Sequence, residues 1–212
     1  MTHPLMQYLP PMQQRAPQVQ PQATPLQSGA GKYYGPVATG YDVKRVNDPK
    51  WTLEQRIIES YLSDLPADSI VLDCPVGTGR FLPFYVTKGF QILGMDLSMD
   101  MLTQASRRDL PGPAKGELRP GDVRATGLPD NSVDAAVMCR LTRWLSPADC
   151  QVAFKELQRV ARKRIVWTAR VANHPHARSV ELFEQALQPG WRIVRNQAGI
   201  DTDYRILMAE AA

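Results

Sequence analysis

The sequence predicts an α/β fold with a mostly parallel, seven-stranded sheet, helices on both faces and an antiparallel hairpin at one edge. Short apolar runs alternate with helix-like segments from residue 69 to residue 187, which is typical of parallel strands joined by right-handed crossovers. The last two apolar runs, 191–196 and 204–210, are too close for a crossover helix between them. They should therefore pair antiparallel at the sheet edge.

Composition divides the chain into three segments. Six prolines and seven glutamines fall within the first 28 residues, where apolar residues are scattered. Such a segment buries too little apolar surface to offset the entropy of ordering, so 1–31 should be a flexible arm that can bind a protein partner. An N-terminal cap is expected at 32–66. The rest, 67–212, has enough apolar residues for one core.

Three cysteines, Cys74, Cys139 and Cys150, are an odd number without a CxxC pair, so neither a disulfide framework nor a zinc site is indicated. No apolar run approaches 18 residues, and the amino terminus lacks the features of a signal peptide. We expect a soluble, cytoplasmic protein that does not bind membranes. Its net charge of +4 is compatible with an anionic partner or simply with solubility.

The cap should contain one amphipathic helix. Asp48 is the expected N-cap with Pro49 in the first position, and Thr52 with Gln55 is an alternative capping pair. The helix should end in the turn 65–68. Its apolar positions recur at helical spacing and comprise Leu53, Ile57, Ile58, Tyr61, Leu62 and Leu65.

The core alternates strands and helices. The best-marked helix starts at Ser146, with Pro147 first and Asp149 completing a capping box. Its apolar stripe runs from Cys150 to Ala161. The expected strands are 69–73, 90–96, 117–122, 132–139, 164–169, 191–196 and 204–210, and the expected helices are 79–88, 98–108, 146–161 and 179–187.

The strongest functional signal is VLDCPVGTGRFLP at 71–83, where a strand runs into a glycine-bearing loop and a helix. Gly77 and Gly79 allow a ligand to approach the backbone, although a plain tight turn is the alternative. Asp73 ends this strand, and Asp96 ends the next, where a carboxylate can bind a ribose diol. Leu82 replaces the third glycine of the dinucleotide fingerprint, which argues against a dehydrogenase. The pattern indicates a nucleoside ligand without a pyrophosphate.

With 94–102, 121–138 and the closing hairpin, this loop makes residues 67–212 resemble the class I S-adenosylmethionine-dependent methyltransferases. The resemblance implies a Rossmann-like methyltransferase fold and S-adenosylmethionine as cofactor. Its typical first loop glycine is replaced here by Pro75, which cannot donate a backbone hydrogen bond. The cofactor-binding residues that the resemblance implies are Asp73, Cys74, Pro75, Gly77, Gly79, Arg80, Asp96, Leu97, Met101, Asp122, Val123, Cys139 and Arg140.

The resemblance also implies a role for each part of this set. Asp73 and the loop 75–79 would hold the methionine end, and Asp96 would bind the ribose hydroxyls. Leu97 and Met101 would flank the adenine. In the remaining positions, the Asp122 side chain and the Val123 amide would contact the adenine edge, while Cys139 and Arg140 would line the methionine side.

Cationic and titratable residues follow the fourth and fifth strands, over which the acceptor lies in this fold. They suggest an acceptor that carries phosphate or carboxylate, and a solvated basic rim is the alternative. Within this set, His174 is the candidate base and Arg143 the second candidate catalytic residue, although His174 and its rival His176 can also be plain loop residues beside Pro175. The set comprises Arg140, Arg143, Arg170, His174, His176 and Arg178.

Four aromatic residues near these segments each have two alternative roles. Trp144 can stack on a substrate ring or belong to the core. The tyrosines that precede the cap helix, Tyr33, Tyr34 and Tyr41, can form a lid over the cofactor or merely pack.

Several classes of acceptor lack their motifs in this sequence. Neither the Asp/Asn-Pro-Pro-aromatic sequence of amino-group DNA methyltransferases nor a Pro-Cys nucleophile is present, and no carboxylate cluster indicates magnesium, so no metal is expected. A basic run, Arg159, Arg162, Lys163 and Arg164, can touch nucleic acid but is explained by the helix dipole and solvation. The prediction is a methyltransferase for a small or conjugated, anionic acceptor. The alternatives are a degenerate structural subunit and a nucleic-acid modification enzyme.

Overall fold

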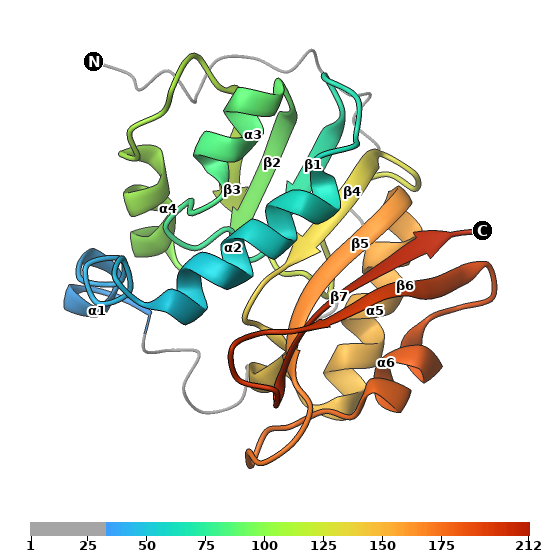
Figure 1. Cartoon of the computed structure of the whole chain (residues 1–212). Helices are drawn as coiled ribbons and strands as arrows, with labels where there is room; N and C mark the ends of the chain where they lie inside the picture. The colour runs from blue at the N-terminus through green and yellow to red at the C-terminus, as the bar shows by residue number, and fades with distance from the viewer. Residues whose placement is uncertain (1–32) are drawn as a thin grey trace.

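A computed structural model describes residues 33–212, so the predicted arm 1–31 lies outside the described residues (Figure 1). Seven strands form one sheet in the order β3-β2-β1-β4-β5-β7-β6. The strands are β1 Ile70–Asp73, β2 Gln91–Asp96, β3 Lys115–Pro120, β4 Val133–Met138, β5 Ala161–Arg170, β6 Trp191–Ala198 and β7 Tyr204–Ala211. The helices are α1 Pro36–Thr39, α2 Pro49–Leu62, α3 Leu82–Lys88, α4 Met99–Ser106, the 3-10 helix η3 Thr142–Trp144, α5 Pro147–Val160 and α6 Val180–Ala186.

The sheet confirms the predicted topology. Strands β1 to β5 pair parallel, and β7 pairs antiparallel with both β5 and β6. The strand order reverses between β1 and β4, so the loops that leave these two strands diverge to opposite faces of the sheet. In α/β folds a ligand binds at such a switch point, beyond the carboxyl ends of the strands.

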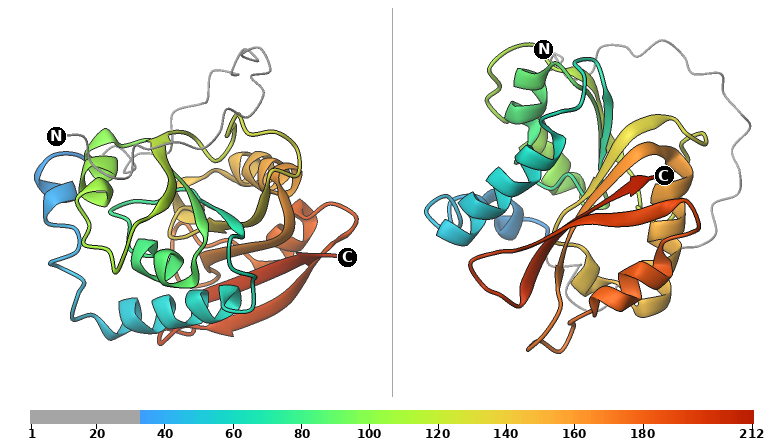
Figure 2. Two further views of the ribbon diagram at one scale, coloured as in Figure 1. Left: turned by 90° about the horizontal axis from the view of Figure 1, so that it is seen from above. Right: turned by 45° about the vertical axis from the view of Figure 1, so that its right-hand side comes forward.

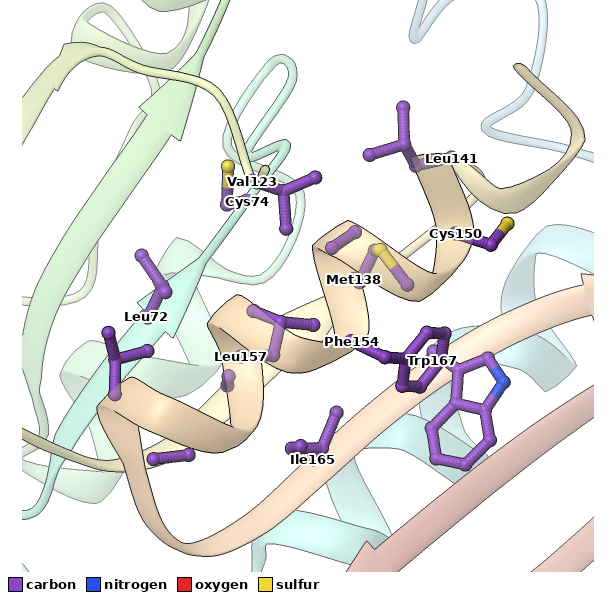
Figure 3. Close-up of a cluster of buried hydrophobic side chains, with 14 of the residues drawn as sticks. Leu72, Cys74, Val123, Met138, Leu141, Cys150, Phe154, Leu157, Ile165 and Trp167 are labelled. Carbon is purple, nitrogen blue, oxygen red and sulfur yellow. The ribbon is translucent and has the colours of Figure 1, made fainter. Parts of the chain in front are cut away.

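Helices cover both faces of the twisted sheet (Figure 2). Alternate strand residues point to opposite faces, so one face packs against α2, α3 and α4 and the other against α5 and α6. Figure 3 shows the core on the face covered by α5 and α6, where Phe154 and Leu157 of α5 lie over strand residues that include Met138, Ile165 and Trp167. None of the helices in 33–212 is long and apolar enough to cross a membrane.

The helix boundaries follow the expected caps. Asp48 Oδ1 accepts a hydrogen bond from the Lys50 amide at 2.9 Å, and Ser146 Oγ accepts one from the Asp149 amide at 3.0 Å. Gly89 ends α3 in the left-handed conformation with φ of 74°. Helix α2 ends at Leu62, before the expected turn at 65–68.

The prediction that the basic run 159–164 lies at a helix end is wrong. Strand β5 starts at Ala161, earlier than the predicted 164, so only Arg159 belongs to α5. The four side chains are paired with carboxylates, which the helix dipole and solvation alone do not explain. The pairs are Arg159 with Asp130 and Glu156, Arg162 and Lys163 with Asp134, and Arg164 with Asp64 and Glu210.

Candidate functional site

A cavity of about 360 Å³, here called the larger cavity, lies beyond the carboxyl ends of β1, β2 and β4. It brings together most residues of the predicted cofactor set, although they come from four separate stretches of the chain. Asp73 and Gly79 are the two members that do not line it. The members that do are Cys74, Pro75, Gly77, Arg80, Asp96, Leu97, Met101, Asp122, Val123, Cys139 and Arg140.

Asp96 is held in place by backbone amides. Its Oδ2 accepts a hydrogen bond from the Gly77 amide at 2.9 Å, and its Oδ1 accepts one from the Ser98 amide at 2.8 Å. Burial raises the pKa of Asp96, and the two amides oppose that shift. Each carboxylate oxygen has a second lone pair, so the oriented side chain can still accept bonds from two hydroxyl groups.

Asp73 lies beneath the loop with one oxygen unsatisfied. Its Oδ2 accepts a hydrogen bond from the Tyr85 hydroxyl at 3.2 Å, while Oδ1 is buried and has no hydrogen-bond partner within residues 33–212. Burial raises the pKa of Asp73 to about 8, against the Tyr85 hydrogen bond, which lowers it, and the nearby charge of Asp96 adds to the rise. A buried carboxylate with an orphan oxygen fits a cationic ligand group. Cys74 and Pro75, which follow it directly, line the larger cavity.

The two loop glycines have different roles. Gly77 has φ of 55°, but a Cβ atom there would meet nothing within 4 Å. Gly79 has φ of 76°, and its Cβ would lie 2.5 Å from Leu82 Cδ1 and 3.1 Å from Ala105 Cβ. Gly79 therefore lets α3 pack against α4, and the expectation that a ligand approaches its backbone has no support in this geometry.

The residues expected to contact the adenine line the larger cavity and differ in exposure. Leu97 is 48% exposed, whereas Met101 is buried. Asp122 is bound by the Arg124 guanidinium, with Nη2 2.7 Å from its Oδ2. The ion pair orients this carboxylate and leaves it able to accept a further hydrogen bond.

The segment before α2 closes one side of the larger cavity with Tyr33, Tyr34 and Tyr41. The Tyr33 carbonyl accepts a hydrogen bond from Ser98 Oγ at 2.6 Å. Asp42 accepts one from Thr78 Oγ1 at 2.7 Å and pairs with Arg108. These contacts tie the cap to the loop after β1 and to the start of α4.

Glu54 of α2 is a site residue that sequence reasoning missed. It is 2% exposed and pairs with both Arg80 and Arg140. Burial alone would raise the pKa of Glu54, but the charges of Arg140 and Arg80 lower it below its usual value. One signal was available in the sequence, since this acid shares the apolar side of the helix with Ile58 and Tyr61.

A second cavity of about 160 Å³, here called the smaller cavity, adjoins the first. The two cavities share Tyr33, Tyr41 and Arg140 in their linings. The smaller cavity is completed by α2, η3, the end of β5 and the turn between β6 and β7. Its lining therefore combines residues that are far apart in the sequence.

Half of the predicted acceptor set lines the smaller cavity, namely Arg140, Arg143 and Arg170. His174, His176 and Arg178 line neither cavity. The His174 Nδ1 accepts the His176 amide at 3.1 Å, and Arg178 donates to the Leu145 carbonyl at 2.6 Å. Burial and then the charge of Arg170 lower the pKa of His174. The geometry gives the prediction of His174 as a base no support.

Arg140 lies in the wall between the cavities in an unusual backbone conformation. Its φ is 59°, which is costly for a residue with a Cβ atom. The conformation is held because the Arg140 amide donates to Thr168 Oγ1 at 2.7 Å, while Glu54 holds the guanidinium. The Tyr204 hydroxyl donates to the same Thr168 oxygen at 2.7 Å. This network fixes the wall from both sides.

A family model described as a methyltransferase domain matches residues 71–164, which include both carboxylates of the larger cavity. This match, together with the fold, supports a class I S-adenosylmethionine-dependent methyltransferase. In such a methyltransferase, S-adenosylmethionine supplies an electrophilic methyl group, and the protein mainly aligns donor and acceptor. No group of three or more His, Cys, Asp or Glu side chains in 33–212 of this methyltransferase is arranged to hold a metal ion.

Solved structures share the methyltransferase fold. Magnesium protoporphyrin IX methyltransferase from Synechocystis, with bound SAH, is 16% identical with a TM-score of 0.69, over 85% of this chain and 97% of that one. An Aquifex aeolicus SAM-dependent methyltransferase is 19% identical with a TM-score of 0.62, over 81% and 98%. A Leishmania major SAM-dependent methyltransferase is 22% identical with a TM-score of 0.64, over 82% and 77%. Among curated proteins, none matches this methyltransferase.

Proposed function

We propose that the larger cavity binds S-adenosylmethionine in one defined orientation. Asp96 accepts hydrogen bonds from the ribose hydroxyls, because two backbone amides already aim its carboxylate. The loop 74–77, which lines this cavity, holds the charged methionine end, and the orphan oxygen of Asp73 lies beneath that loop. Leu97 and Met101 flank the adenine.

The smaller cavity binds a small or conjugated acceptor that carries negative charge. The observation that carries this proposal is the shared wall, since Tyr33, Tyr41 and Arg140 line both cavities and so bring a ligand in one beside a ligand in the other. Five cationic side chains and three carboxylates line the smaller cavity, which leaves an excess of two positive charges. Such a cavity favours an anionic acceptor.

Nucleic acid is a weaker candidate for the acceptor. The basic run that suggested it is occupied by pairs with carboxylates, so these side chains are less able to neutralise phosphates. The alternative of a purely structural subunit is also weaker, because the oriented carboxylate of Asp96 and the unsatisfied oxygen of Asp73 support a ligand-binding role.

Calorimetry with S-adenosylhomocysteine tests the donor half of the proposal. Replacing Asp96→Asn should weaken binding by roughly 1 to 3 kcal/mol, because the ribose loses a buried charged partner. Asp109→Asn is the matched control, since Asp109 is exposed and lies outside both cavities. Equal affinities for the wild type and Asp96→Asn would show that the ribose binds elsewhere.

A further inference from the structure

The lining of the smaller cavity leads to an inference about the acceptor atom, which rests on the proposed function. We propose that the methyl group is transferred to a carboxylate oxygen of the acceptor, with Arg143 binding that carboxylate, so that the product is a methyl ester. Two features carry this proposal: the guanidinium of Arg143, which no carboxylate or carbonyl holds within residues 33–212, and the lack of a base in the cavity.

Arg143 differs from the other cations of the smaller cavity. Within residues 33–212 no carboxylate lies at ion-pair distance from it, and its buried Nε has no hydrogen-bond partner. Its contacts are the Tyr33 hydroxyl, 3.4 Å from Nη2, and the Trp144 ring, whose centroid is 4.5 Å from Cζ. Its fork is therefore able to bind an acceptor carboxylate with two parallel hydrogen bonds.

The remaining cations are already engaged. Arg140 pairs with Glu54, and both Lys50 and Arg170 pair with Asp201. Arg45 has no ion pair within residues 33–212 either, but it donates to the Tyr41 carbonyl at 2.8 Å, and its Cζ lies 3.7 Å from the centroid of the Tyr41 ring. Arg143 is the cation of this cavity whose guanidinium is held by neither a carboxylate nor a carbonyl within residues 33–212, and one such fork matches the two oxygens of a carboxylate.

The carboxylates of the smaller cavity are poor bases. Burial alone would raise the pKa of Glu54, but the charges of Arg140 and Arg80 lower it. The hydrogen bond from Arg170 lowers the pKa of Asp201. Asp48 caps α2 by accepting the Lys50 amide. An efficient general base has a pKa near the working pH, so Glu54 and Asp201 are unsuited to removing a proton from an alcohol or an ammonium group.

The other titratable groups do not supply a base either. Burial raises the pKa of Tyr41 and of Tyr204, so both phenols stay protonated and act as donors. His174 and His176 line neither cavity. An acceptor that is already ionised at neutral pH needs no base, and a carboxylate meets this condition.

The transfer balances without a proton. A lone pair of the carboxylate oxygen forms the new bond to the methyl carbon, while the bond from that carbon to sulfur breaks and its electron pair goes to sulfur. The carboxylate and the sulfonium lose their opposite charges together, giving a neutral ester and a neutral thioether. The ester no longer pairs with Arg143, so the same contact that binds the acid favours release of the product.

Binding of small probes to the protein loaded with S-adenosylhomocysteine tests the inference. Loading is first verified by calorimetry, and failure at that step counts against the proposed function rather than against Arg143. Acetate and benzoate should bind about tenfold or more tightly than acetamide and benzamide, since hydrogen bonds between charged partners are stronger than those to a neutral amide. Phenyl phosphate should bind more weakly than benzoate.

Arg143→Gln should remove the preference for the acids, whereas Arg192→Gln, at an exposed position of β6 outside both cavities, should preserve it. Equal binding of acid and amide, no binding of either acid at millimolar concentration, or tighter binding of phenyl phosphate would overturn the inference. So would an unchanged preference in Arg143→Gln.

The product identifies the acceptor atom directly. With labelled S-adenosylmethionine and equal amounts of benzoate and benzyl alcohol, label should appear in methyl benzoate and be released as methanol by mild alkali. The rate should stay flat between neutral and mildly alkaline pH, because no proton is removed. Label in the benzyl ether, label in neither product, or a rate that rises in proportion to hydroxide would contradict carboxylate methylation.

Discussion

The two cavities of this methyltransferase are built in different ways. The larger cavity is organised by short loops that directly follow β1 and β2, and its key hydrogen bond joins Asp96 to the Gly77 amide. The smaller cavity depends on pairs between distant segments, such as Arg140 with Glu54, which are 86 residues apart. The comparison teaches that the hydrogen bonds of the larger cavity join residues close in the sequence, whereas the smaller cavity forms only once the cap has docked on the sheet.

Of the changes considered, replacing Glu54 should have the largest effect on stability. Glu54→Gln keeps the shape but leaves the Arg80 and Arg140 charges without their counter-charge, which should lower the free energy of unfolding by about 3 to 5 kcal/mol. Urea unfolding measures this, with Glu184→Gln on the exposed side of α6 as the control. A loss no larger than the control's would mean that the cap is not held by this network.

The same pair should respond to acid. The pKa of Glu54 is lowered in the folded state, so its stabilisation is complete above the unfolded value of about 4.3 and is lost as pH falls through the folded value. The stability difference between wild type and Glu54→Gln should therefore shrink only below about pH 4. A difference that is constant with pH would contradict the assigned charge.

Variants of the two loop glycines distinguish the cost of a steric clash from the cost of a positive φ. Gly79→Ala combines a positive φ with a clash against Leu82, so it should cost about 2 to 4 kcal/mol of stability. Gly77→Ala meets open space and should cost only about 1 to 2 kcal/mol. Thermal or urea unfolding distinguishes the two, and equal losses would argue against the packing role of Gly79.

Proton release should accompany cofactor binding. Because the pKa of Asp73 is raised to about 8, unliganded protein should lose stability as pH rises from about 4 to 8, where only the unfolded chain has released this proton. A cationic methionine end favours the ionised form, so binding at pH 7 should release up to about one proton. Calorimetry in buffers of different ionisation enthalpy measures this number. Asp73→Asn should release none, and wild-type release near zero would place the cation elsewhere.

The smallest effect is expected at the adenine end. Leu97→Ala should weaken S-adenosylhomocysteine binding by about 1 kcal/mol through lost apolar contact and leave stability unchanged, since Leu97 is 48% exposed. Val152→Ala, at a residue of α5 that is 49% exposed, is the matched control. Identical affinities in the two variants would move the adenine away from Leu97.

Much of the donor side could be predicted because its signals are local. The parallel strands, the antiparallel hairpin, the caps at Asp48 and Ser146, and the position of Asp96 at a strand end all follow from neighbouring residues. The start of β5 was missed because charged side chains, paired across the sheet, occupy positions that look like a solvated helix end.

The lining of the smaller cavity could not be predicted from the sequence, because it depends on contacts between distant elements. Glu54 is explained only by Arg80 and Arg140, which reach it from other elements, and Arg178 belongs to the same loop as His174 yet turns to the Leu145 carbonyl. Chain proximity to β4 and β5 therefore could not tell which cations enter the smaller cavity.

A crystal structure of the protein with S-adenosylhomocysteine tests most directly whether the two cavities form one donor and acceptor site. The ribose hydroxyls should lie within hydrogen-bond distance of Asp96, the homocysteine end should lie beside Asp73 and the loop 74–77, and the sulfur should face the wall formed by Tyr33, Tyr41 and Arg140. A ligand bound outside the larger cavity, or one whose sulfur points away from the smaller cavity, would contradict the account.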